Sequence, residues 1–420
     1  MKKDTLLIVI SHFIQLVSQF IIIRTLNFEY GPSIYGAFII IIGVLNLSGQ
    51  ITMFPLNNFF QLRFAVKNKF QLRDFVLKYS SIIFSFIIAL LGLVIFGEFK
   101  LHTLAFGLAF LIFTLQYNSI LVYFNSKAKH KIFSSLKIIH NLIYISTIIL
   151  SCHYFSFDFN YLMVVLTLMY LIEVALLLFY LYRKKLIIIE FSKIQKLILD
   201  DTLCKKLKKK LSQYLEFSLP LALIAILTYI TGSSERYFTK IYFSDEMVGI
   251  YASIYLIATK PYVFSKGIIE TILRPKMYLF LKNDTHSHEN FHKYRYPWFI
   301  VCTFIIFIGL IFNLFFWELY SIIIPEEYLQ YKDLLLPLTL AYLPFLCGQY
   351  YRRILLRSSE NKILLKIEIF VACFTLLVYL IICILIPKLI YLSFVPFLAF
   401  LIRFILLTIE VKKIKIINSF

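Results

Sequence analysis

Twelve long apolar runs, each bounded by charged residues, fill most of this 420-residue chain. A helix that crosses a bilayer needs about 20 predominantly apolar residues, so runs of this length predict membrane spans. An outer-membrane barrel is excluded because its strands alternate apolar and polar residues. The predicted spans are 5–23, 34–56, 79–96, 103–124, 138–155, 161–182, 217–232, 247–269, 298–317, 334–350, 364–386 and 389–409.

The composition agrees with this interpretation. Hydrophobic residues make up 60% of the chain and charged residues 16%, whereas soluble domains have roughly 45–50% and about 25%. An ordinary soluble protein and a disordered chain are therefore both excluded. The predicted fold class is all-α, a polytopic membrane protein with about 12 transmembrane helices in two six-helix lobes around a central cavity.

Lys and Arg are distributed unevenly among the connections between spans. Of the 43 Lys and Arg, 34 lie in alternate connections and at the two chain ends, and the opposite loops are short and mostly acidic or neutral. The positive-inside rule places the basic set, with both termini, in the cytoplasm. The net charge of +20 is thereby explained without nucleic acid as a partner.

The longest and most basic connection, 183–212, divides the chain into halves. Its mixture of apolar residues and Lys suits an amphipathic helix on the inner leaflet, although we favour a linker whose charge determines topology. The predicted organisation is an N-terminal six-helix lobe at 1–182, a basic cytoplasmic amphipathic linker at 183–212 and a C-terminal six-helix lobe at 213–420.

The two halves share a short internal similarity. Arg24 precedes Gly36 by 12 residues, and Arg236 precedes Gly249 by 13, so the offset is 212 to 213 residues. This spacing is close to half the chain and indicates duplication. Because each half has six spans, an axis along the membrane normal would relate the two lobes, and rocking of the lobes would give alternating access.

Charged residues interrupt several of the spans, where insertion costs about 2.5–3.5 kcal/mol each. Such residues usually face a cavity or a charged partner. The candidate substrate-binding cations are Lys260, Arg24, Arg236, Lys266 and Arg403, and the candidate coupling groups or charge partners are Glu173, Glu235 and Glu270.

Each candidate also has a structural interpretation. Lys266 and Glu270, four residues apart, can neutralise each other. Arg403 is placed two turns from the inner face, which favours snorkelling to the headgroups, and snorkelling stays equally open for Arg24 and Arg236. Lys260 and Glu173 lie closest to the middle of their predicted spans, so snorkelling is the weakest explanation for these two residues.

The motifs of common enzymes and metal sites do not occur. The chain has no P-loop, no dinucleotide-binding glycine motif, no nucleophile elbow and no zinc-protease motif. Its six Cys are scattered, and the polar stretch with His286, His288 and His292 is typical of a solvated loop. No cofactor and no metal are predicted, and transport without ATP is favoured over catalysis.

Three stretches resemble polysaccharide flippases of the Wzx type, in the multidrug/oligosaccharidyl-lipid/polysaccharide exporter superfamily. They are IIIRTLNFEYGPSIYGAFIIIIGVLNL (21–47), SSERYFTKIYFSDEMVGIYASIYLIATKP (233–261) and IIETILRPKMY (268–278). Glu235 stands where an Asp is common in that family.

The resemblance implies a V-shaped bundle in the bacterial inner membrane that moves an undecaprenyl-pyrophosphate-linked oligosaccharide to the outer leaflet. That step serves the synthesis of surface polysaccharide, either O-antigen or capsule. The implied partners are the lipid-linked oligosaccharide, membrane lipid and other membrane proteins of polysaccharide assembly. Two alternatives stay open: an ion-coupled small-molecule exporter of the same superfamily, and a polytopic glycan-assembly enzyme such as a polymerase.

Overall fold

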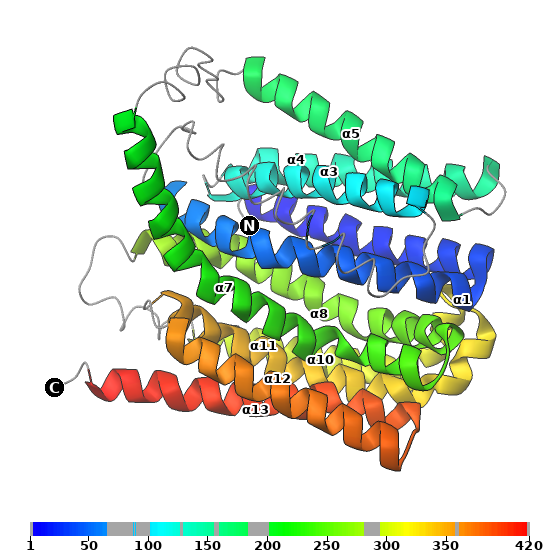
Figure 1. The fold of residues 1–420 in the computed structure, drawn as a ribbon. Helices are drawn as coiled ribbons and strands as arrows, with labels where there is room; N and C mark the ends of the chain where they lie inside the picture. The colour runs from blue at the N-terminus through cyan, green and yellow to red at the C-terminus, as the bar shows by residue number, and fades with distance from the viewer. Residues whose placement is uncertain are drawn as a thin grey trace. The chain divides into compact units, whose positions relative to one another are not determined.

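The computed structural model describes residues 3–64, 87, 89, 101–126, 129–154, 159–183, 201–280, 295–357 and 361–417. Within these residues every regular element is helical (Figure 1). The α-helices are α1 (Lys3–Phe64), α3 (Leu101–Ser126), α4 (His130–Tyr154), α5 (Phe159–Arg183), α7 (Asp201–Tyr242), α8 (Asp245–Phe280), α10 (Arg295–Phe315), α11 (Leu335–Arg357), α12 (Asn361–Leu385) and α13 (Leu389–Ile417), and the 3-10 helices are η1 (Trp317–Ile322) and η2 (Glu326–Leu334).

The helices confirm the prediction of an all-α polytopic membrane protein. Among the described residues, nine helical stretches are long and apolar enough to cross a bilayer. One of them, Thr5–Ile51, contains two of the predicted spans. The predicted span 79–96 lies outside the described residues, so the total of twelve stays a prediction.

α1 joins its two predicted spans through Gly31, which has φ 72° and ψ 173°. Side chains with a Cβ rarely adopt a positive φ, and glycine adopts it at little steric cost. The ribbon of α1 turns back on itself within its length (Figure 1). Gly31 therefore provides the turn between the first two predicted spans.

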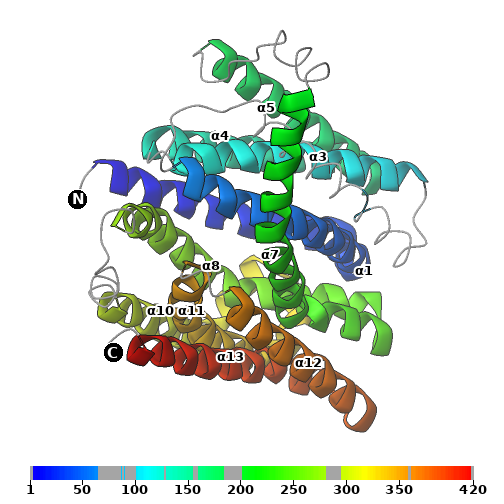
Figure 2. The ribbon, with the colours of Figure 1, turned by 60° about the vertical axis from the view of Figure 1, so that its left-hand side comes forward.

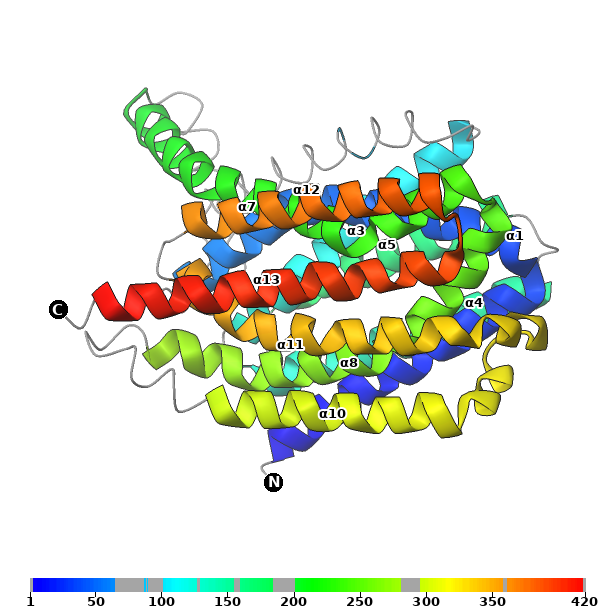
Figure 3. The same cartoon turned by 90° about the horizontal axis from the view of Figure 1, so that it is seen from below.

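The chain forms two compact units, residues 1–43 with 227–420 (unit 1) and residues 44–226 (unit 2). In unit 1, α11 packs against α8, α10, α12 and α13 (Figure 3). In unit 2, α3, α4 and α5 pack against one another (Figure 2). The predicted lobes at 1–182 and 213–420 have other boundaries and stay a prediction. α7 begins at Asp201, so the last part of the predicted linker 183–212 is helical and continuous with the following span.

The two glycines of the internal similarity meet in unit 1. A Cβ on Gly36 would overlap the carbonyl oxygen of Asp245 and would lie 3.0 Å from the backbone nitrogen of Gly249. A Cβ on Gly249 would overlap the carbonyl oxygen of Pro32. Pro32 and Asp245 are also 213 residues apart, so the contact is reciprocal, as across a two-fold axis. The backbones of α1 and α8 approach this closely because both positions are glycine.

Candidate functional site

A cluster of buried charged side chains in unit 1 lies between four helices. Arg403 of α13 donates through Nε to Oε1 of Glu368 in α12 over 3.0 Å, and its Nη2 donates to the same oxygen. Arg352 of α11 approaches that oxygen with Nε at 3.6 Å. Glu368 and Arg403 are 0% and 3% exposed. Two guanidinium groups therefore converge on one carboxylate.

Thr228 of α7 completes this cluster. Its hydroxyl oxygen accepts hydrogen bonds from Nη2 of Arg352 at 2.9 Å and from Nη2 of Arg403 at 3.1 Å. In the part of the chain that the structure describes, Nη1 of Arg403 and Oε2 of Glu368 have no hydrogen-bond partner. The cluster thus presents convergent guanidinium donors, the arrangement that proteins use to hold carboxylate or phosphate groups.

The position of Arg403 corrects the snorkelling interpretation. α13 continues to Ile417, beyond the predicted end of the last span at 409, so Arg403 lies deeper in its helix than expected. Its guanidinium points to Glu368 on the neighbouring helix. A paired arginine at this depth has no reason to reach the headgroups, because its charge is neutralised within the protein.

A second cluster links α8 and α11. The predicted pair of Lys266 and Glu270 is present, with Nζ 3.9 Å from Oε1. Arg353 forms an ion pair with the same carboxylate. The sequence predicts a cytoplasmic connection at 351–366, between the spans 334–350 and 364–386, and its sidedness stays a prediction. In the structure α11 continues to Arg357, and Arg352 and Arg353 pair with acids of other helices.

A third cluster contains the predicted residues Glu235, Arg236 and Lys260. Glu235 is fully buried, and among the described residues its ion-pair partner is Nε of Arg236 at 3.9 Å. Neither carboxylate oxygen accepts a hydrogen bond from a described residue. Arg236 lies over the ring of Tyr255, with Cζ 5.6 Å from its centroid. Lys260 is half-buried and close enough for its charge to interact with that of Arg236.

Arg24 differs from the other predicted cations because it is exposed. Its Nη1 donates to the carbonyl oxygen of Ile322 at the end of η1. Its Cζ lies 4.8 Å from the ring centroid of Phe28, one turn further along α1. Arg24 therefore links α1 to the segment between α10 and α11 and contacts none of the three clusters among the described residues.

Among the described residues of unit 2, a buried carboxylate pairs with a histidine. Nδ1 of His140 in α4 lies 2.7 Å from Oε2 of Glu173 in α5. The hydroxyl of Tyr170 lies 3.2 Å from the other ring nitrogen, and the ring of Tyr117 lies 4.5 Å from the imidazole between centroids. Glu173 was predicted as a deep acid, and its partner is a group that can bind and release a proton.

Sequence reasoning missed Arg352, Arg353 and Glu368 as site residues. Glu368 lies four residues inside the predicted span 364–386, so the signal that singled out Glu173, an acid within a span, applies to it as well. No sequence signal identifies Arg352, because a basic residue at the end of a span is normally a topology determinant.

No group of three His, Cys, Asp or Glu within the described ranges could hold a metal ion. The predicted loop residues His286, His288 and His292 lie outside these ranges.

Comparison with known proteins finds a solved structure with a similar fold. No family model matches the chain, and no curated protein matches it in sequence. The solved structure of a mutant of VcmN, a MATE transporter from Vibrio cholerae, is similar, with a TM-score of 0.65 and 10% identity over 98% of this chain and 95% of that chain. The chain therefore has the polytopic helical fold of a MATE transporter over nearly its whole length.

Proposed function

We propose that this chain is a secondary transporter of the superfamily that includes MATE transporters, and that it acts as a flippase for a polyprenyl-pyrophosphate-linked oligosaccharide. It would move the repeat unit across the inner membrane for synthesis of a surface polysaccharide. Support comes from the MATE-like fold, from the resemblance of three sequence stretches to Wzx-type flippases and from the charge of the buried clusters.

The charge pattern of unit 1 is the observation that carries the choice of substrate. Each of the three clusters combines two cations with one carboxylate: Arg352 and Arg403 with Glu368, Lys266 and Arg353 with Glu270, and Arg236 and Lys260 with Glu235. A surplus of cations at membrane depth favours an anionic substrate, because charge left unbalanced there is costly.

A pyrophosphate matches this surplus. Arg can donate two parallel hydrogen bonds to a phosphate, and Lys can supply a compact positive charge. Lys260 and Arg236 are the first candidates for this contact, since no described residue forms a salt bridge with Lys260. Lys266, Arg403 and Arg24 are further candidates. The polyprenyl chain would stay in the lipid while the polar head crosses.

Carboxylates are the candidates for coupling. Glu173 with His140 forms a proton-binding pair, and Glu235 is a fully buried acid whose oxygens accept no hydrogen bond among the described residues. Binding of a proton or a metal cation at either place would change the charge of a buried site. Such a change can bias a transporter between two conformations.

An ion-coupled exporter of small molecules is the second candidate function. The similarity to a MATE transporter favours it as much as it favours the flippase, since the fold is common to both. An exporter of cations would need buried carboxylates in excess, which is the reverse of the pattern in unit 1. A glycan-assembly enzyme is the third candidate, and the transporter-like fold counts against it.

Deletion of the gene in its host tests the proposal. We expect complete lipid-linked repeat units to accumulate on the inner leaflet while surface polysaccharide disappears, and the wild-type gene to restore both. If surface polysaccharide is normal and the cells instead show altered sensitivity to small cationic compounds, the exporter is favoured over the flippase. Units that are translocated but not polymerised would indicate the assembly enzyme.

A further inference from the structure

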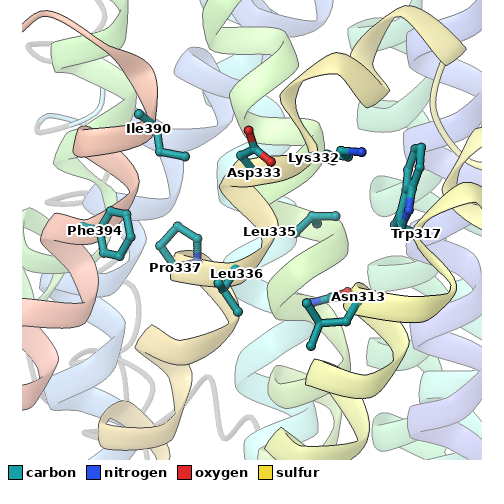
Figure 4. A pocket seen from close by; sticks show the side chains of 10 residues that line it. Asn313, Trp317, Lys332, Asp333, Leu335, Leu336, Pro337, Ile390 and Phe394 are labelled. Atoms are coloured by element: carbon teal, nitrogen blue, oxygen red, sulfur yellow. The ribbon is translucent and has the colours of Figure 1, made fainter.

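A cavity of about 390 Å³ opens in unit 1 between the ends of α10, α11 and α13 (Figure 4). One wall is apolar and includes Leu314, Leu336 and Phe394. These side chains are 56%, 41% and 41% exposed, although they belong to helices long and apolar enough to span a membrane. In a bilayer, such side chains are covered by acyl chains.

The other part of the cavity lining carries polar groups. Nζ of Lys332 lies 4.3 Å from the ring centroid of Trp317, and Asp333 follows Lys332 at the end of η2 (Figure 4). In the described part of the chain, neither Lys332 nor Asp333 forms an ion pair or a hydrogen bond through its side chain. These residues lie at the ends of spans that the charge distribution assigns to the outer face, where tryptophan is typical of the headgroup level.

An apolar wall beside one cation and one anion matches a single zwitterionic phospholipid. The phosphate can bind the ammonium group of Lys332, the headgroup cation can bind the carboxylate of Asp333, and an acyl chain can follow the apolar wall. We propose that this cavity binds one phosphatidylethanolamine molecule of the outer leaflet. The site is separate from the charge clusters and does not depend on which substrate is transported.

The choice of a primary ammonium over a quaternary one follows from the same residues. A primary ammonium has three N–H donors and can form charge-assisted hydrogen bonds with Asp333. A choline group has no N–H donor and is recognised on aromatic faces. The ring of Trp317 already has Lys332 over it. The cavity should therefore discriminate between phosphatidylethanolamine and phosphatidylcholine.

The tryptophans of the chain allow a direct test, because the sequence contains only two. Trp317 lines the cavity, whereas Trp298 is buried at the opposite end of α10 and donates to the carbonyl oxygen of Leu346 over 3.0 Å. In the Trp298→Phe variant, Trp317 is the single tryptophan and therefore the source of all tryptophan fluorescence. The full chain is reconstituted in vesicles, and brominated phosphatidylethanolamine or brominated phosphatidylcholine is titrated as a quencher.

We expect brominated phosphatidylethanolamine to quench Trp317 at about a tenfold lower mole fraction, the effect of one charge-assisted hydrogen bond. Asp333→Asn should abolish this preference. Glu327→Gln, an exposed acid in η2 outside the cavity, should retain it. Native mass spectrometry of the chain with both tryptophans, with and without Asp333→Asn, gives an independent count of bound lipid if Trp298→Phe does not fold.

Equal quenching by the two lipids, or a preference that persists in Asp333→Asn, would overturn the proposal. Displacement of phosphatidylethanolamine from the cavity by a polyprenyl phosphate would also overturn it and would assign the cavity to the chain of a transported lipid.

Discussion

Nδ1 of His140 in α4 lies 2.7 Å from the carboxylate of Glu173 in α5, and Glu173 is buried while His140 is partly buried. The hydroxyl of Tyr170 is near the second ring nitrogen, so both nitrogens of the imidazole have partners. A pair of this kind can store a proton inside a helical bundle, which makes it the coupling candidate of unit 2.

The His140–Glu173 pair should contribute measurably to the stability of the protein. We expect a double-mutant cycle of His140→Gln and Glu173→Gln to give a coupling energy of about 1–2 kcal/mol, in the upper range for side chains in membrane proteins. Thermal unfolding of the purified protein in detergent measures it. The exposed pair of Lys413 and Glu410 is the matched control and should give about 0.5 kcal/mol or less. Equal coupling energies at the two pairs would contradict a special role for His140.

The Glu368 cluster should respond asymmetrically to substitution. Glu368→Gln leaves two buried guanidinium groups without their shared carboxylate, and we expect it to lower stability by about 3–5 kcal/mol. Arg403→Gln should cost less, about 1–3 kcal/mol, because Glu368 keeps Arg352 as a partner at 3.6 Å. Lys366→Gln, an exposed substitution on the same helix, should stay within about 0.5 kcal/mol. Thermal unfolding of the three variants ranks their losses of stability. A loss for Arg403→Gln as large as that for Glu368→Gln would refute this account.

The contact between Gly36 and Gly249 should not tolerate a methyl group. Alanine at either position would meet backbone atoms of the opposing helix, and we expect a loss of about 1–3 kcal/mol for each. Gly232→Ala in α7 is the control, because nothing lies within 4 Å of its added Cβ. That substitution should be neutral or stabilising by up to about 1 kcal/mol, through helix propensity. Similar melting temperatures for all three variants would show that the helices can separate at no cost.

Lys260 should matter for transport and not for folding. Under the proposed function, we expect Lys260→Ala to lower translocation by about tenfold to a hundredfold, the effect of losing one charge-assisted contact. Protein abundance should stay unchanged, because no described residue pairs with Lys260. Lys260→Arg should retain part of the activity. Lys388→Ala, an exposed change between α12 and α13, is the control. Transport at the parent level in Lys260→Ala would remove Lys260 from the mechanism.

The helices and the local pairs were predictable from the sequence. Apolar runs of about 20 residues have few alternatives to a spanning helix, because backbone polar groups in lipid must be bonded within the segment. Lys266 and Glu270 are four residues apart on one helix, so their pairing depends on local geometry alone. Glu173 was recognisable as a candidate site residue because a lone acid in an apolar run is costly.

The partners of these charges were decided only by the tertiary structure. Glu173 pairs with a histidine 33 residues away, and Arg403 contacts Glu368 and Thr228 at separations of 35 and 175 residues. Helix periodicity relates residues within one helix and carries no information about which faces of different helices meet. That choice depends on packing, as where Gly36 and Gly249 allow α1 and α8 to approach. The sequence by itself therefore determined the helices and some of the charges buried in them, and the packing of the helices decided which further charges are buried and which of them share a site.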